Sequence, residues 1–150
     1  LQMVFDEGLY DPANEPDIAY AYLFSRFPGE EWRTQREVRR LLDTCFTTAA
    51  DGIPGNDDTG TMSAWAVFSM MGFYPDCPGE PYYTLTAPVF DRVEIATERG
   101  PLVIEAERPA DGAGYIGRMT LGGRPLGKYR LSHDELLGGG RLKFELKNDK

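Results

Sequence analysis

The chain has 150 residues, 41% of them hydrophobic and 27% charged, which is typical of a globular domain with a sizeable core. Its formal net charge is −8 and its basic residues form no long run, which argues against nucleic acid or an anionic membrane as a partner. No apolar stretch approaches the roughly 20 residues that a membrane-spanning helix needs.

The first segment, residues 1–16, is expected to be irregular, because Pro12 and Pro16 hold the residues before them in extended conformations. It has neither an initiator Met nor the basic start of a signal peptide, so we expect a mature form, a fragment or a section of a larger protein. A helix is predicted over 17–27, where apolar side chains recur at helical spacing until a Pro-Gly pair ends it.

A second helix is predicted over 30–46. Its apolar stripe comprises Trp32, Val38, Leu41, Leu42, Cys45 and Phe46. Four arginines fall mostly elsewhere around the cylinder: Arg33, Arg36, Arg39 and Arg40. We expect these arginines to form a solvated face paired with acidic side chains rather than a phosphate site.

A third helix is predicted over 59–71. Its residues are apolar on nearly every face, which is the pattern of a helix buried on all sides. Three helices are too few to surround it. We therefore expect a piece of a helical array, with further cover from the sheet or from helices outside this chain.

The sequence changes character after residue 72. A proline-rich loop over 73–81 is followed by short runs rich in β-branched residues. The expected strands cover 82–86, 92–97, 102–107, 115–121, 128–131 and 141–146. These runs predict an antiparallel sheet, so the fold class is α+β, with helices in residues 1–74 and a β-rich region in residues 75–150.

Cysteine and histidine usage limits the possible chemistry. Cys45 and Cys77 can form a disulfide or remain as two buried thiols, and the sequence leaves both open. His133 is the only histidine and there is no Cys-x-x-Cys pair, which argues against a zinc site. We expect His133 to lie at a turn or helix start in a structural or solvent-exposed position.

A turn rich in Gly and Pro precedes the third helix and presents Asn56-Asp57-Asp58. An Asp or Asn before a helix commonly caps it by accepting a backbone N–H. Alternatively, acids held on so rigid an element can serve in a site. The spacing lacks the pattern of an EF-hand calcium loop.

Several motifs, in order along the chain, carry a resemblance that covers nearly all of it. They are Asn14-Glu15-Pro16, Trp32-Arg33-Thr34-Gln35, the run from Gly55 to Trp65, Gly72-Phe73-Tyr74-Pro75, Cys77-Pro78-Gly79 and Leu121-Gly122-Gly123. Together they closely resemble the C-terminal part of the glycoside hydrolase family 92 α-mannosidases.

That resemblance implies the last helices of an (α/α)6 barrel followed by antiparallel β elements, in a fragment of a larger two-domain enzyme. It implies a calcium-dependent, inverting exo-α-mannosidase that is secreted or periplasmic, acts on mannose-containing glycans such as N-glycans, and works together with its own N-terminal remainder. The general acid of the family would lie upstream of this chain, so the isolated chain is expected to be inactive.

The resemblance also assigns roles. Asp58 would be the general base, and Asn56 stands where many members have a second carboxylate, so it would orient the water or Asp58. Asp57, at a variable position of the motif, is included as a third catalytic candidate. Glu15 would bind the sugar or support the Ca²⁺ shell, with Asn14 beside it as substrate and metal contact.

Two alternatives remain open. Asp17-Ile18 replaces the Ser-His of many members close to the sugar site, and the leaving group could be a sugar or, as in relatives that uncap mannose-1-phospho-6-mannose, a phosphate. A non-catalytic carbohydrate-binding module is the other class. Its sugar-stacking candidates would be Tyr82, Tyr83, Tyr115 and Tyr129, which are equally at home as core or cross-strand partners.

Overall fold

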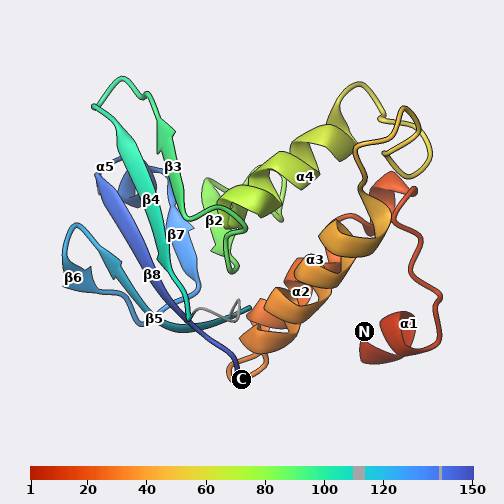
Figure 1. Cartoon of the computed structure of the whole chain (residues 1–150), viewed down its shortest axis with the longest axis horizontal. Helices are drawn as coiled ribbons and strands as arrows, with labels where there is room; N and C mark the ends of the chain where they lie inside the picture. Colours follow the sequence, from red (N-terminus) through yellow and green to blue (C-terminus); the bar gives the residue numbers. More distant parts are fainter. Residues whose placement is uncertain (110–113, 139) are drawn as a thin grey trace.

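The computed structural model describes residues 1–150 except 110–113 and 139. Helices fill the first half of the chain and lie beside the strands of the second half (Figure 1). The helical elements are α1 (Gln2–Asp6), η1 (Glu15–Asp17), α2 (Tyr20–Leu23), η2 (Phe24–Arg26), α3 (Glu31–Cys45) and α4 (Thr61–Met71). None of the described helices is long and apolar enough to cross a membrane.

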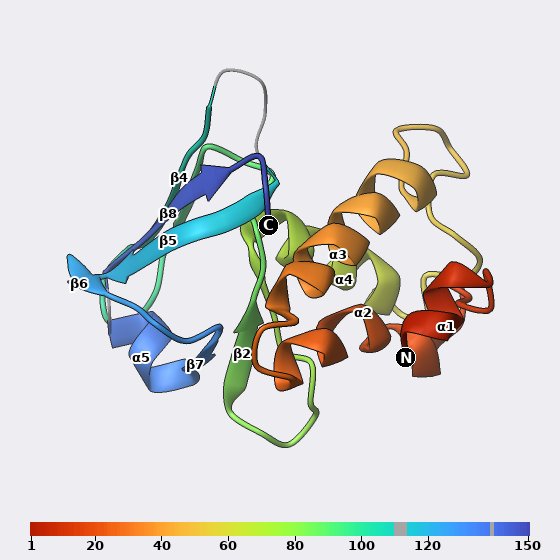
Figure 2. The ribbon, with the colours of Figure 1, turned by 90° about the horizontal axis from the view of Figure 1, so that it is seen from below.

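The strands form two sheets. One has the order β1-β2-β7, with β1 at Phe73–Tyr74, β2 at Tyr82–Leu85 and β7 at Arg130–Ser132. The other has the order β3-β4-β8-β5-β6, with β3 at Arg92–Ile95, β4 at Leu102–Glu107, β8 at Arg141–Lys147, β5 at Tyr115–Leu121 and β6 at Arg124–Pro125. The short helix α5 (His133–Gly138) links β7 to β8 and lies on the strand side of the molecule (Figure 2).

The α+β class is confirmed, but three details of the prediction are wrong. Strand β8 pairs with β4 in parallel, with Ile104 opposite Leu142, so the larger sheet is mixed rather than antiparallel. Alternating apolar residues determine which face a strand buries, whereas the direction of its neighbour depends on the path of the chain between them. Residues 73–74, expected as loop, pair with β2, and α1 forms within the segment expected to be irregular.

Two apolar clusters make up the core of the described residues. The first lies among the strands and α5 and includes Leu85, Ile104, Leu131, Leu142 and Phe144. The second joins α2, α3 and α4 and includes Tyr22, Val38, Leu41, Trp65 and Tyr74. Phe68 packs against both clusters, so α4 couples the helical layer to the sheets.

Helix α4 is not buried on all sides in this chain. Met62, Trp65, Ala66 and Ser69 are buried, but the opposite side is open and Val67 is 53% exposed. The described residues leave part of α4 uncovered, in keeping with the expectation that these helices are too few to surround it. Among the described residues, the other helices and the sheets cover the side of α4 that carries Trp65 and Ser69.

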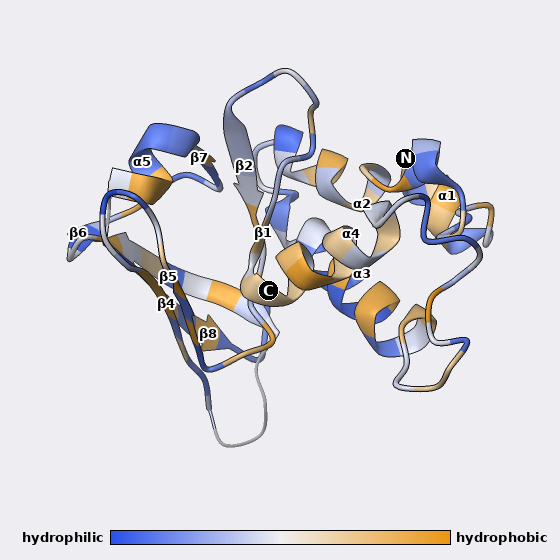
Figure 3. Cartoon of the chain, turned by 90° about the horizontal axis from the view of Figure 1, so that it is seen from above, coloured by the Kyte–Doolittle hydropathy of each residue, from blue (hydrophilic) through white to orange (hydrophobic). Residues whose placement is uncertain are grey.

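Helix α3 has an apolar and a charged side, and Figure 3 shows both orange and blue residues along it. Its arginines pair with acids as predicted: Arg33 with Glu30, Arg36 and Arg40 with Glu37, and Arg39 with Asp43. Trp32 does not belong to the buried stripe. Its ring lies under the cations of Arg33, Arg36 and Lys150, which ties the C-terminal end of the chain to the start of α3.

Candidate active site

The turn that leads into α4 has an unusual backbone. Asp58 and Thr59 have φ angles of 48° and 61°, in the left-handed region that few residues other than glycine occupy. A β-branched residue such as Thr is strained there, at a cost of roughly 1–3 kcal/mol. Such a conformation persists only where neighbouring contacts hold it.

Asp57 supplies those contacts. Its Oδ1 accepts hydrogen bonds from the backbone N–H of Ser63 at 2.7 Å and from the Ser63 hydroxyl at 2.8 Å. Its carbonyl oxygen accepts from the N–H groups of Gly60 and Met62, both at 3.1 Å. The helix-cap interpretation thus holds for Asp57, although it lies three residues before Gly60, the N-cap residue.

Asp58 is used differently. Its carbonyl oxygen accepts from the N–H of Thr61 at 3.3 Å and from the Thr61 hydroxyl at 2.8 Å, so its backbone is held. Its side chain is exposed, and none of the residues that the structure describes hydrogen-bonds to its carboxylate. Asn56 is exposed as well. The turn therefore fixes the Asp58 backbone and leaves its carboxylate open to solvent.

The second predicted segment lies against this turn. Ala13, directly before Asn14 and Glu15, contacts Gly55 so closely that a Cβ added at Gly55 would lie 2.6 Å from the Cβ of Ala13. In Figure 1 the loop that follows α1 and the loop that leads into α4 lie beside each other near the C-terminal end of α3. The structure thus brings the Asn14-Glu15 segment next to the turn of Asn56, Asp57 and Asp58.

Two hydrogen bonds join the region that follows Glu15 to helix α4. The indole Nε1 of Trp65 donates to the carbonyl of Ile18 at 2.9 Å. The hydroxyls of Tyr22 and Ser69 are 2.7 Å apart in the buried interface between α2 and α4. The Trp65 and Ser69 side chains therefore anchor the chain that follows Glu15 to α4.

Two hollows adjoin the acidic residues. One, of about 490 Å³, lies between the 47–53 loop and the turn, and Gly55 and Asp57 line it. The other, of about 380 Å³, lies between η1 and the loop after β1, and Glu15, Tyr74 and Asp76 line it. Burial, together with the negative charges of Asp76 and Glu15, raises the pKa of Tyr74 above its ordinary value.

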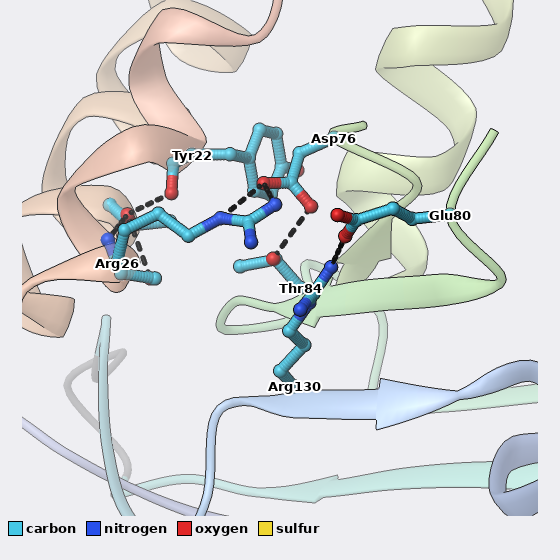
Figure 4. Close-up of polar contacts among 8 residues, drawn as sticks. Tyr22, Arg26, Asp76, Glu80, Thr84 and Arg130 are labelled. Atoms are coloured by element: carbon cyan, nitrogen blue, oxygen red, sulfur yellow. Dashed lines mark hydrogen bonds and ion pairs between the residues drawn. The ribbon is translucent and has the colours of Figure 1, made fainter. Parts of the chain in front are cut away.

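An ion pair between a half-exposed arginine and a buried carboxylate supports the second hollow and was missed by sequence reasoning (Figure 4). The guanidinium of Arg26 donates to Asp76 Oδ2 at 2.8 Å, and the hydroxyl of Thr84 donates to Asp76 Oδ1 at 2.8 Å. The Asp76 side chain is only 1% exposed. This network joins η2 to β2, and the one signal for it in the sequence is an acid within a proline-rich segment.

The described residues do not by themselves form a calcium shell. None of them gathers into a group of three or more Asp, Glu, His or Cys side chains suited to a metal ion. Asn14 and Glu15 are exposed neighbours that offer a few oxygen atoms, whereas Ca²⁺ takes six to eight oxygen ligands.

The remaining predicted residues lie outside the turn that leads into α4. His133 is exposed at the start of α5, as expected, with its Nδ1 2.9 Å from the hydroxyl of Tyr83. Cys45 and Cys77 are both free and half-buried, so the thiol alternative holds. Tyr83 and Phe73 form a T-shaped ring pair, and the guanidinium of Arg130 lies over one face of the Tyr82 ring.

A carboxylate left open on a rigid turn, beside a second acidic segment, is the kind of arrangement found in glycosidases, which work with carboxylate pairs. The model of the family described as "Glycosyl hydrolase family 92 catalytic domain" matches residues 2–148, so the chain belongs to glycosyl hydrolase family 92. The resemblance read from the motifs is confirmed.

Solved structures of the same family superpose closely on this chain. The α-mannosidase BT3965 from Bacteroides thetaiotaomicron matches with a TM-score of 0.87 and 29% identity over 95% of this chain and 19% of its own. The inverting mannosidase BT2199 from the same organism matches with a TM-score of 0.85 and 34% identity over 99% of this chain and 20% of its own.

A curated relative, described as an uncharacterized secreted glycosidase of Arthroderma benhamiae, is 29% identical over 97% of this chain. The match covers 19% of that relative. The chain thus spans about a fifth of the length of the relatives that it matches.

Proposed function

We propose that this chain forms the base-bearing part of an inverting exo-α-mannosidase, with Asp58 as the general base. One observation carries the assignment: Asp57 uses its carboxylate to cap α4, whereas the adjacent Asp58 carboxylate has no hydrogen-bond partner among the described residues. The description of BT2199 as an inverting mannosidase supports the stereochemistry.

In this proposal Asp58 takes a proton from a water molecule as the water attacks the anomeric carbon. Attack comes from the face opposite the leaving group, so the configuration inverts. Asn56 carries an amide, which cannot take up the proton but can orient the water by donating or accepting a hydrogen bond. The general acid, and the rest of the (α/α)6 barrel to which these helices are proposed to belong, would come from other parts of the protein.

Glu15 and Asn14 are proposed to contact the mannose from the segment that Ala13 places against Gly55. Calcium dependence is a separate part of the proposal. Glu15 and Asn14 would provide some of the oxygen ligands, and residues outside the described set would complete the shell. Secretion is also proposed, from the description of the fungal relative as a secreted glycosidase.

The test is hydrolysis by the full-length protein of α-mannobiosides and of mannose-1-phospho-6-mannose, with calcium and then with a chelator. Asp58→Asn should lower kcat by about 10³-fold or more while mannoside binding persists, because the amide cannot accept the proton. NMR of the first product should show β-mannose. Unchanged turnover in Asp58→Asn, with the wild type active, would remove the assignment.

The two substrates distinguish the leaving groups. A preference for the mannobioside would indicate that the full-length protein supplies an effective general acid. A preference for the phosphodiester would indicate uncapping, because a phosphate leaves without strong acid assistance. The chain alone is expected to be inactive in both assays.

A further inference from the structure

The two adjacent acids of the turn have different surroundings. Asp57 is half-buried and accepts hydrogen bonds from three residues: Gly60, Met62 and Ser63. The two bonds from Ser63 converge on one carboxylate oxygen. Its charge also lies at the N-terminal end of α4, where the helix dipole favours an anion.

These contacts close the turn around Asp58. The carbonyl of Asp57 receives the Gly60 and Met62 N–H groups, and its carboxylate receives Ser63, so both ends of the residue are tied to the first turn of α4. The residues in between, Asp58 and Thr59, are the two non-glycine residues with positive φ in the described chain. The ties to α4 therefore hold the strained conformation in place.

We infer that Asp57 is a positioning residue that holds Asp58 in its reactive orientation and takes no part in proton transfer itself. The inference rests on the proposed role of Asp58 and extends it. It gives Asp57 a structural role in place of the catalytic one, because its Oδ1 is engaged by the two hydrogen bonds from Ser63 that tie the turn to α4.

Substitutions at position 57 separate charge from hydrogen bonding. Asp57→Asn keeps an oxygen that can accept both bonds from Ser63 but removes the negative charge. Asp57→Ala removes both. If the residue acts by positioning, the Asn variant should keep activity and the Ala variant should lose it, whereas a proton-transferring residue would lose activity in both.

The experiment measures kcat and KM of the full-length protein for the substrate that it hydrolyses best. Asp57→Ala should lower kcat by about 30- to 100-fold with KM within about threefold, since a displacement near 1 Å can cost about 10² in rate. Asp57→Asn should stay within about threefold of wild type. Asp43→Ala is the charge-matched control, because Asp43 is exposed on α3 and should leave kcat unchanged.

Hydrogen exchange gives a readout that does not depend on turnover. The amides of the first turn of α4, including Ser63, should exchange faster in Asp57→Ala and at the wild-type rate in Asp57→Asn. The inference would be overturned if Asp57→Asn were as inactive as Asp58→Asn. It would also be overturned if Asp57→Ala kept the kcat of the wild type. Full activity of Asp58→Asn would instead defeat the proposed function, which is a different result.

Discussion

Gly55 and Ala13 touch at the point where the two acidic segments meet. A Cβ built on Gly55 would lie 2.6 Å from the Cβ of Ala13, which is too close for two carbon atoms that are not bonded to each other. Gly55 also has a φ of +64°. Position 55 thus needs a glycine for two separate reasons: a left-handed backbone and the absence of a side chain. The contact sets how closely the Asn14-Glu15 segment approaches the turn of Asp58.

The first prediction follows from this contact. Gly55→Ala should lower kcat/KM about tenfold or more, because the new methyl group pushes the two segments apart. Adding Ala13→Gly should restore much of the activity by removing the opposing methyl group, without relieving the backbone strain. Steady-state kinetics of the single and double variants of the full-length protein measure the recovery.

Gly8→Ala is the control for backbone strain. Gly8 has a similar φ of +66°, but a Cβ there would meet no atom within 4 Å. The Gly8→Ala substitution should lower the free energy of unfolding by about 1–2 kcal/mol and leave activity unchanged. Equal losses of kcat/KM in Gly8→Ala and Gly55→Ala would show that the contact with Ala13 has no role in activity.

The second prediction concerns the ion pair between Arg26 and Asp76. Asp76→Ala leaves the guanidinium of Arg26 and the hydroxyl of Thr84 without their carboxylate partner. Loss of one member of a buried pair costs about 3–5 kcal/mol, and the partial exposure of Arg26, at 34% of its side chain, places the expected loss near the lower end. Denaturant unfolding measures the change.

Asp91→Ala is the matched control, because the Asp91 side chain pairs with Arg108 but is 83% exposed. It should lower the free energy of unfolding by less than about 1 kcal/mol. Similar losses for the two variants would contradict the structural role of Asp76.

The third prediction is a loss of stability in alkali. Burial raises the pKa of Tyr22 and of Tyr10 well above their ordinary value of 10.0. Above pH 10 the unfolded chain releases these protons and the folded chain keeps them, so the folded state binds more protons and its stability falls as pH rises. Below pH 10 both states keep their protons and the full stability is present.

Each such tyrosine should lower the free energy of unfolding by about 1.4 kcal/mol per pH unit above pH 10. Denaturant unfolding at pH 8, 9, 10 and 11 tests the slope. Tyr22→Phe should make the slope shallower, although it also removes the contact with the Ser69 hydroxyl. A free energy of unfolding that is constant up to pH 11 would contradict the prediction.

The fourth prediction concerns Cys45 and Cys77, which are both free and half-buried. Reductant should cause no change in the intact mass of the protein that is attributable to a disulfide between Cys45 and Cys77. Peptide mapping after alkylation without reductant should find both cysteines modified, at rates that rise when denaturant exposes them. Recovery of a peptide pair joined through Cys45 and Cys77 would contradict the structure.

Local sequence patterns predicted much of this protein. Apolar side chains at helical spacing located α3 and α4 to within two residues, and alternating residues located β2, β4, β5 and β8 with similar accuracy. The Asn-Glu-Pro and Gly-Asn-Asp-Asp motifs pointed to the family that the comparison confirmed. These features are readable because each depends on residues that are close in the chain.

Only the tertiary structure decided how those elements meet. It pairs β4 with β8 in parallel, places Ala13 against Gly55, and buries Asp76 between Arg26 and Thr84. It also separates two identical side chains, since Asp57 reaches Ser63 and Asp58 remains open to solvent. The sequence around an acidic residue does not specify which hydrogen-bond donor its carboxylate will meet. That depends on the path of the backbone in the folded protein.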